Sequence, residues 1–96
     1  SHGNSLKDHN RQPSVLEDVV QQVVRGSESI VGFMLESHLK AGNQKVTKDL
    51  SQLEYGVSIT DACIDWKTTE VCLIDAADRL RDGDPEINAL RNGVTF

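Results

Sequence analysis

The fold class is indicated most clearly by the segment SIVGFML, residues 29–35. Its apolar side chains do not alternate with polar ones, as they would in a strand with one face in water. A nearly continuous apolar run of this length is typical of a strand buried on both faces, as in a parallel sheet. The first ionisable side chains, Glu36 and His38, follow at the carboxyl end of this predicted strand.

A second strand is predicted over SITDACI, residues 58–64, which is rich in β-branched side chains. The polar connection between the two strands, residues 39–57, is long enough for the crossover that parallel strands require. We expect a short helical turn in this connection, near Leu50–Tyr55.

Helices are predicted on either side of the two strands. Ser14 and Glu17 have the spacing of a capping box, which predicts a helix with Ser14 as its N-cap and a stop at Gly26. The second helix is expected over Trp66–Arg81, ended by Gly83 and followed by a short turn at Asp84-Pro85. The expected apolar stripe of the first helix is Val15, Leu16, Val19, Val20, Val23 and Val24, and that of the second is Val71, Ile74, Ala77 and Leu80.

The order helix, strand, connection, strand, helix predicts an α/β fold. Two central-type strands and two helices leave strand edges and sheet faces uncovered. We therefore expect these 96 residues to be a section of a larger α/β fold, with too few strands to close a sheet.

Charge and composition exclude several classes of partner. With 10 basic and 15 acidic residues the net charge is −5, and no lysine or arginine stripe is available to neutralise phosphates. We therefore expect no nucleic-acid partner. We also expect no membrane partner, since no apolar run approaches the length of a membrane span. Cys63 and Cys72 are too few for a disulfide framework and are expected to be packed thiols, as in a reducing, cytoplasmic compartment.

Three short motifs contain side chains that bind metals: SHGNS with His2, ESH with Glu36, and TDAC with Asp61. Sites in parallel α/β folds lie at the carboxyl ends of strands. If His2 also follows a strand, the three side chains meet on one rim. One imidazole and two carboxylates suit a divalent manganese, iron, cobalt or zinc ion. Other readings remain open: His2 as a disordered terminal residue, Glu36 as a solvated residue after a strand, and His38 as a structural loop residue.

The segments SHGNSLKDHNRQP, GFMLESHLKAGNQ and YGVSITDACIDW resemble three signature segments of the class I 3-deoxy-7-phosphoheptulonate (DAHP) synthases, in the family's order. The resemblance covers about residues 1–81, whereas the tail, residues 82–96, matches nothing that we can place. It implies a (β/α)₈ TIM barrel, of which this chain would form about the last quarter. It also implies the family's reaction, in which phosphoenolpyruvate, erythrose 4-phosphate and water give DAHP and phosphate at the start of the shikimate pathway.

The resemblance also implies roles for individual residues. His2, Glu36 and Asp61 match the family's metal ligands, and His2 and Asp61 are also expected beside the substrates. Asn4 and Lys7 are expected to shape the substrate pocket. The parent protein is expected to be a homo-oligomer.

Several parts of the family's active site have no counterpart in this sequence. These are the cysteine ligand on an early strand and the KPRT-type and GARTxxSQ-type segments that hold the substrate phosphates. We therefore expect the isolated chain to be inactive. Two alternatives stay open: an inactive remnant that binds another subunit through exposed strand edges, and a small metal-binding α/β module without this chemistry.

Overall fold

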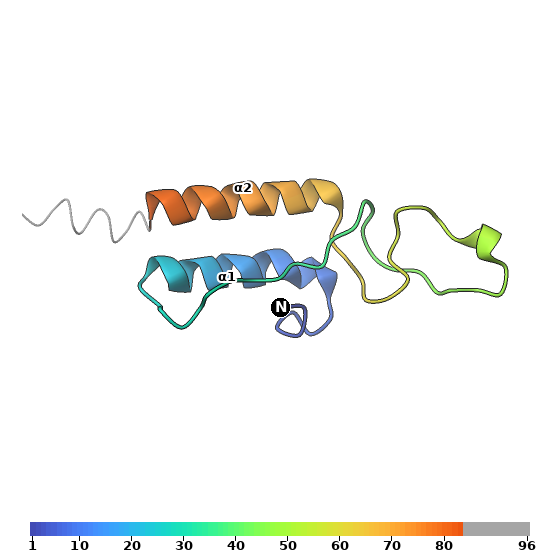
Figure 1. Cartoon of the computed structure of the whole chain (residues 1–96), viewed down its shortest axis with the longest axis horizontal. Coiled ribbons are helices and arrows are strands. Elements are labelled where there is room, and N and C mark those ends of the chain that lie inside the picture. The colour runs from blue at the N-terminus through green and yellow to red at the C-terminus, as the bar shows by residue number, and fades with distance from the viewer. Residues whose placement is uncertain (84–96) are drawn as a thin grey trace, which may run out of the picture.

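The computed structural model describes residues 1–83, which are organised around two α-helices. The helices lie side by side and run in the same direction (Figure 1). The predicted turn at Asp84-Pro85 lies outside the described residues. The elements in chain order are η1 (His9–Arg11), α1 (Gln12–Val24), η2 (Leu50–Gln52) and α2 (Trp66–Asp82).

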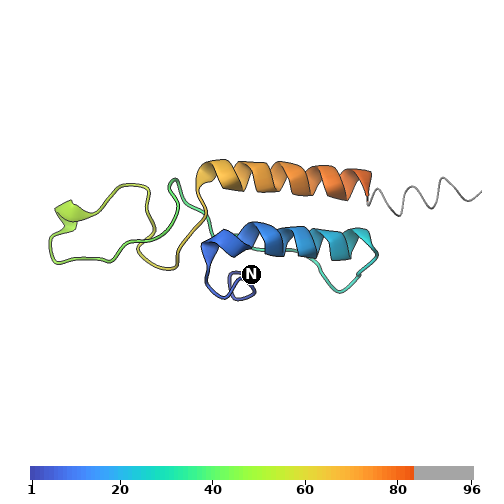
Figure 2. The same ribbon diagram turned by 180° about the vertical axis from the view of Figure 1, so that it is seen from behind.

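The chain between α1 and α2 makes two excursions. Residues 28–36, here called the return segment, run back along α1 without regular structure. Residues 37–64, here called the arm, then project beyond the ends of both helices before the chain enters α2 (Figures 1 and 2). The predicted helical turn near Leu50–Tyr55 is confirmed by η2 in the arm.

The two predicted strands, residues 29–35 and 58–64, are wrong for the described part of the chain. Neither forms a strand there, and Val31 in the return segment is 99% exposed. A strand needs a neighbour that pairs with its backbone N–H and C=O groups. Within residues 1–83, no second strand lies along residues 29–35, so this apolar run stays extended and unpaired.

The two segments do meet at their carboxyl ends, in the predicted parallel sense. Ser37 and Ile64 form a parallel bridge. The Ile64 N–H donates to the Glu36 carbonyl at 3.0 Å, and the His38 N–H donates to the Ile64 carbonyl at 2.9 Å. This bridge joins the end of the return segment to the residue just before the cap of α2.

The N-cap of α1 lies three residues earlier than the predicted N-cap Ser14, so the capping box at Ser14 and Glu17 is wrong. The N-cap is Arg11, which makes no side-chain cap bond. The preceding turn η1, capped by the Asp8 carboxylate, runs directly into the helix and takes over the role of a cap. Ser14 is therefore an exposed residue within the first turn, whereas the predicted stop at Gly26 (φ +108°) is confirmed.

Helix α2 matches the predicted range Trp66–Arg81 to within one residue. Its N-cap is Asp65, whose carboxylate accepts a hydrogen bond from the Thr68 N–H at 2.8 Å. The helix ends at Gly83, as predicted, where φ is +81°.

The predicted apolar face of α2 is not the face that packs. Val71, Ile74 and Leu80 are about half exposed, at 55%, 55% and 47%, and Ala77 is exposed as well. The only helix beside α2 within residues 1–83 is α1, so α2 turns its small side chains inward. The core that results consists of Leu16, Val20, Cys72 and Ala76, with Val24 and Leu35 packed against it. Burial of Cys72 confirms its predicted packing role and raises the pKa of its thiol.

Within residues 1–83, no helix combines the length and the apolar character that a membrane crossing requires.

Candidate metal centre

His2 lies in a tight loop, residues 1–8, and is 1% exposed. The loop is closed by hydrogen bonds from the Lys7 N–H to the His2 carbonyl (3.1 Å) and from the Asp8 N–H to the Ser5 carbonyl (3.1 Å). Leu6 and Lys7 both have positive φ, 56° and 64°, which costs about 1–2 kcal/mol for each residue that is not glycine. The reading of His2 as a disordered terminal residue is therefore wrong.

Glu36 ends the return segment and is held there by Gln12, the first residue of α1. The Gln12 amide donates to the Glu36 carbonyl at 3.0 Å and accepts from the Glu36 N–H at 2.8 Å. Gln12 is 2% exposed, so both bonds form away from water. The side chain thus pairs with Glu36 as a neighbouring strand would, and it fixes the position from which the carboxylate extends.

The side chains of His2 and Glu36 meet, with 3.4 Å between Nε2 and Oε2. Both of these atoms are buried, and neither has a hydrogen-bond partner. Leaving a buried polar atom without a partner costs about 1–3 kcal/mol. A cation that both atoms bind would remove this cost, and an imidazole nitrogen and a carboxylate oxygen are common ligands of divalent transition metals. The pair therefore fits part of a metal site.

Asp61, the third predicted ligand, has a side chain that is 44% exposed and bound to a lysine. The Lys7 ammonium donates to Asp61 Oδ2 at 2.7 Å. This bond lowers the pKa of the Asp61 carboxyl below its ordinary value and raises the pKa of Lys7. Within residues 1–83, however, no three histidine, cysteine, aspartate or glutamate side chains converge as a ligand cluster.

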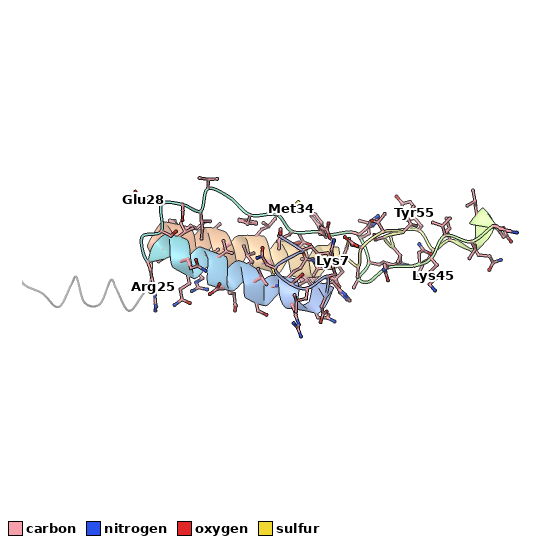
Figure 3. The ribbon with its side chains drawn as sticks, turned by 90° about the horizontal axis from the view of Figure 1, so that it is seen from below. Lys7, Arg25, Glu28, Met34, Lys45 and Tyr55 are labelled. Carbon is pink, nitrogen blue, oxygen red and sulfur yellow. The ribbon has the colours of Figure 1, made fainter. Side chains whose placement is uncertain are left out.

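The structure places the remaining predicted residues in less central positions. Asn4 is exposed, and its side-chain oxygen accepts a hydrogen bond from the Ser1 amino group at 2.9 Å. Lys7 lies where the arm leaves the helical body (Figure 3). His38 is exposed, and its Nδ1 accepts from the Leu39 N–H at 2.9 Å, as a structural loop residue would. Cys63 is a buried thiol, as predicted.

Two residues that hold the site were missed in the sequence. Ser5 belongs to the SHGNS motif but was not singled out; it is completely buried and its hydroxyl contacts His2 Nδ1 at 2.7 Å. The signal available in the sequence was the position of Ser5, a polar residue three positions after the predicted histidine ligand. Gln12 gave no signal, because its partner Glu36 lies 24 residues away and is reached only through the fold.

The fold and the site together define a class of unit within residues 1–83: two helices that run in the same direction, joined by an extended segment, with a histidine–carboxylate pair at one end. The chain belongs to the DAHP synthetase I family, whose model matches residues 1–73.

Individual relatives agree with this assignment. The chain is 56% identical over 78 residues to a phospho-2-dehydro-3-deoxyheptonate aldolase of Alternaria alternata, covering 80% of this chain and 21% of the relative. It is 52% identical over 73 residues to the Tyr-sensitive phospho-2-dehydro-3-deoxyheptonate aldolase of Escherichia coli K12, covering 76% of this chain and 20% of that enzyme.

Among solved structures, the chain is similar to a phospho-2-dehydro-3-deoxyheptonate aldolase from Francisella tularensis SCHU S4. The TM-score is 0.75 with 46% sequence identity, and the match covers 84% of this chain and 23% of that one. The chain thus spans only about a fifth of the length of these three relatives.

Proposed function

We propose that this chain forms the metal-ligand end of a DAHP synthase, which condenses phosphoenolpyruvate with erythrose 4-phosphate and water to give DAHP and phosphate. The observation that carries the proposal is the buried contact between His2 Nε2 and Glu36 Oε2, 3.4 Å apart and both without a hydrogen-bond partner. The family match over residues 1–73 includes both of these residues and Asp61.

The proposed parent fold is a (β/α)₈ barrel, of which residues 1–81 form about the last quarter and residues 82–96 a tail. Consecutive helices that run in the same direction support this, because each βα unit of such a barrel returns the chain to the same end (Figure 1). The parallel bridge between Ser37 and Ile64 lies where two adjacent strands of the barrel would end. The rest of the sheet would then pair with residues 29–35 of the return segment, along which no strand lies within residues 1–83.

His2, Glu36 and Asp61 would hold a divalent manganese, iron, cobalt or zinc ion. Such an ion supplies a Lewis acid that polarises a carbonyl oxygen. The chain's own residues would bind and orient: Ser5 holds His2 at 2.7 Å, Gln12 holds Glu36, and Lys7 neutralises Asp61. His2 and Asp61 would also lie beside the substrates, with Asn4 and Lys7 nearby at the pocket's edge.

The two substrates would need cationic side chains from elsewhere in the parent. Each carries a phosphate group, and phosphates are held by clustered arginines and lysines. The basic residues near the site, Lys7 and Arg11, are already paired with Asp61 and Asp8. We therefore propose that the isolated chain is inactive. From the family resemblance, we also propose that the parent is a cytoplasmic homo-oligomer.

A second candidate is an inactive remnant that binds another subunit. Exposed apolar side chains on the return segment favour it: Val31 is 99% exposed and Met34 is 54% exposed. Figure 3 shows Met34 on the outer side of this segment. In the proposed parent, these side chains would be covered by neighbouring strands and helices.

A chimera tests the proposed function. The 73 matched residues of the E. coli Tyr-sensitive enzyme would be replaced by those of this chain, and phosphoenolpyruvate consumption measured with erythrose 4-phosphate and Mn²⁺. We expect turnover that a chelator abolishes, and a loss of at least about 100-fold in His2→Gln, Glu36→Gln and Asp61→Asn variants. Glu54→Gln, an exposed carboxylate in the arm, is the matched control and should retain activity.

Full activity of the Asp61→Asn or the Glu36→Gln chimera would overturn the ligand assignment. The isolated chain, assayed in parallel, should show no turnover. Chelator-sensitive turnover of the isolated chain would instead mean that several copies complete the site together, and would contradict the inactive remnant.

A further inference from the structure

The Ser5 hydroxyl makes two short contacts with the same residue. Its oxygen lies 2.7 Å from the His2 carbonyl oxygen and 2.7 Å from His2 Nδ1. Ser5 is completely buried, and His2 is 1% exposed, so water does not compete for either contact. These distances constrain where the single hydroxyl proton lies.

A carbonyl oxygen only accepts hydrogen bonds, so the contact with the His2 carbonyl requires the Ser5 hydroxyl to donate its proton there. The hydroxyl has no second proton for the ring. The contact with Nδ1 is then attractive only if Nδ1 carries a hydrogen and donates it to Ser5 Oγ. The reverse assignment would leave two oxygens 2.7 Å apart with no hydrogen between them.

We propose that Ser5 is a positioning residue that fixes a hydrogen on His2 Nδ1 and so turns Nε2 towards Glu36. Nε2 then faces Glu36 Oε2 across 3.4 Å, where one cation could bind both atoms. The role of this arrangement in metal binding rests on the proposed function, but the hydrogen on Nδ1 follows from the two contacts of the Ser5 hydroxyl alone.

The other tautomer makes different use of both contacts. The Nε2–H tautomer would leave no hydrogen between Nδ1 and Ser5 Oγ and would place one between Nε2 and Oε2. Neither atom has a hydrogen-bond partner, and a spacing of 3.4 Å is longer than ordinary N–H···O bonds. A metal-binding histidine commonly donates its other ring N–H to a neighbouring acceptor, which selects the tautomer. Here the acceptor is a serine hydroxyl from the same loop.

The first measurement is the ring nitrogen spectrum of the 96-residue chain labelled with ¹⁵N-histidine, without metal. The chain has three histidines, and the His2 signals are those lost in a His2→Gln variant. We expect a hydrogen on His2 Nδ1. A His2 Nδ1 without a hydrogen would overturn the proposal, and this result needs no Ser5 variant to fold.

The second measurement compares Zn²⁺ affinity of Ser5→Ala, Ser5→Thr and Ser14→Ala by titration of the ¹⁵N signals. Ser5→Ala should shift the tautomer towards Nε2–H and weaken Zn²⁺ binding about 10–100-fold, the usual effect of removing such a partner. Ser5→Thr keeps the hydroxyl and should restore the wild-type tautomer. Ser14 is exposed on α1, and its variant should match wild type.

An unchanged tautomer in folded Ser5→Ala would show that the loop, not the hydroxyl, orients the ring, and would overturn the proposal. Failure of the proposed function is separable from this result. If His2→Gln leaves the chimera fully active while wild-type His2 still carries its proton on Nδ1, the metal role fails and the positioning by Ser5 stands.

Discussion

The candidate site has two halves that are built differently. The half formed by His2 and Glu36 is here called the buried half, because the facing atoms His2 Nε2 and Glu36 Oε2 are buried, although the Glu36 side chain as a whole is 30% exposed. It is held by Ser5 and Gln12, two residues exposed by no more than 2%. The exposed half is the pair Lys7–Asp61, whose side chains are 64% and 44% exposed. Buried hydrogen bonds resist rearrangement, because breaking one leaves a buried polar group without a partner, which costs free energy. Exposed ion pairs are screened by water and contribute little to stability. The buried half is therefore fixed before any ligand arrives, and the exposed half can rearrange.

The largest effect is expected from changing the buried half at Glu36. Glu36→Gln supplies an amide N–H that can donate to the His2 Nε2 atom, which has no partner now. We expect the free energy of unfolding to rise by about 1 kcal/mol. Zn²⁺ affinity should fall at least about 100-fold, because the carboxylate that the cation needs is lost. Chemical denaturation and Zn²⁺ titration measure the two effects, which have opposite signs.

Glu54→Gln is the matched control, because Glu54 pairs with Lys40 in the arm and has no contact with the site. A Glu36→Gln chain that is less stable than wild type and still binds Zn²⁺ normally would show that the buried half is an ordinary ion pair.

A smaller effect is expected from the support of the buried half. Gln12→Leu keeps the volume of the side chain but leaves the Glu36 N–H without its 2.8 Å partner. The Glu36 carbonyl retains a bond from the Ile64 N–H at 3.0 Å. We expect a loss of about 1–3 kcal/mol in stability and a loss of about 10-fold in Zn²⁺ affinity.

Gln22→Leu is the control for this change, since Gln22 is an exposed residue of the same helix and its side-chain amide donates to Asp18 at 2.8 Å. If the two substitutions had equal effects on stability and Zn²⁺ affinity, Gln12 would support the site no more than a surface glutamine does.

The helices could be predicted from the sequence because their hydrogen bonds are local. Gly26 and Gly83 mark their ends correctly, and α2 lies within one residue of its predicted range. The start of α1 was missed because η1 continues into it, which no local capping pattern reveals. Residues 29–35 have the sequence of a buried strand, but no strand pairs along them within residues 1–83, so the predicted strand does not form there.

The candidate site was only partly predictable for a related reason. His2 and Glu36 were identified through their motifs, and the structure brings them together. Two other contacts depend on how distant segments pack. Asp61 pairs with Lys7, 54 residues away, and Gln12 binds the Glu36 backbone. The buried face of α2 was missed for the same reason, because the packing partner, not the apolar pattern, selects Cys72 and Ala76.

The smallest effect is expected in the exposed half, and its sign separates two roles for Lys7. The Lys7 ammonium occupies Asp61 Oδ2 at 2.7 Å, where it competes with any other cation for that oxygen. Lys7→Met should therefore raise Zn²⁺ affinity by about 2–5-fold and leave the stability almost unchanged, as is usual for exposed pairs. Lys40→Met is the control: Lys40 pairs with Glu54 at the same 2.7 Å distance but in the arm. A fall in Zn²⁺ affinity for Lys7→Met alone would mean that Lys7 holds Asp61 in place for the cation, and the exposed half would then be as fixed as the buried one.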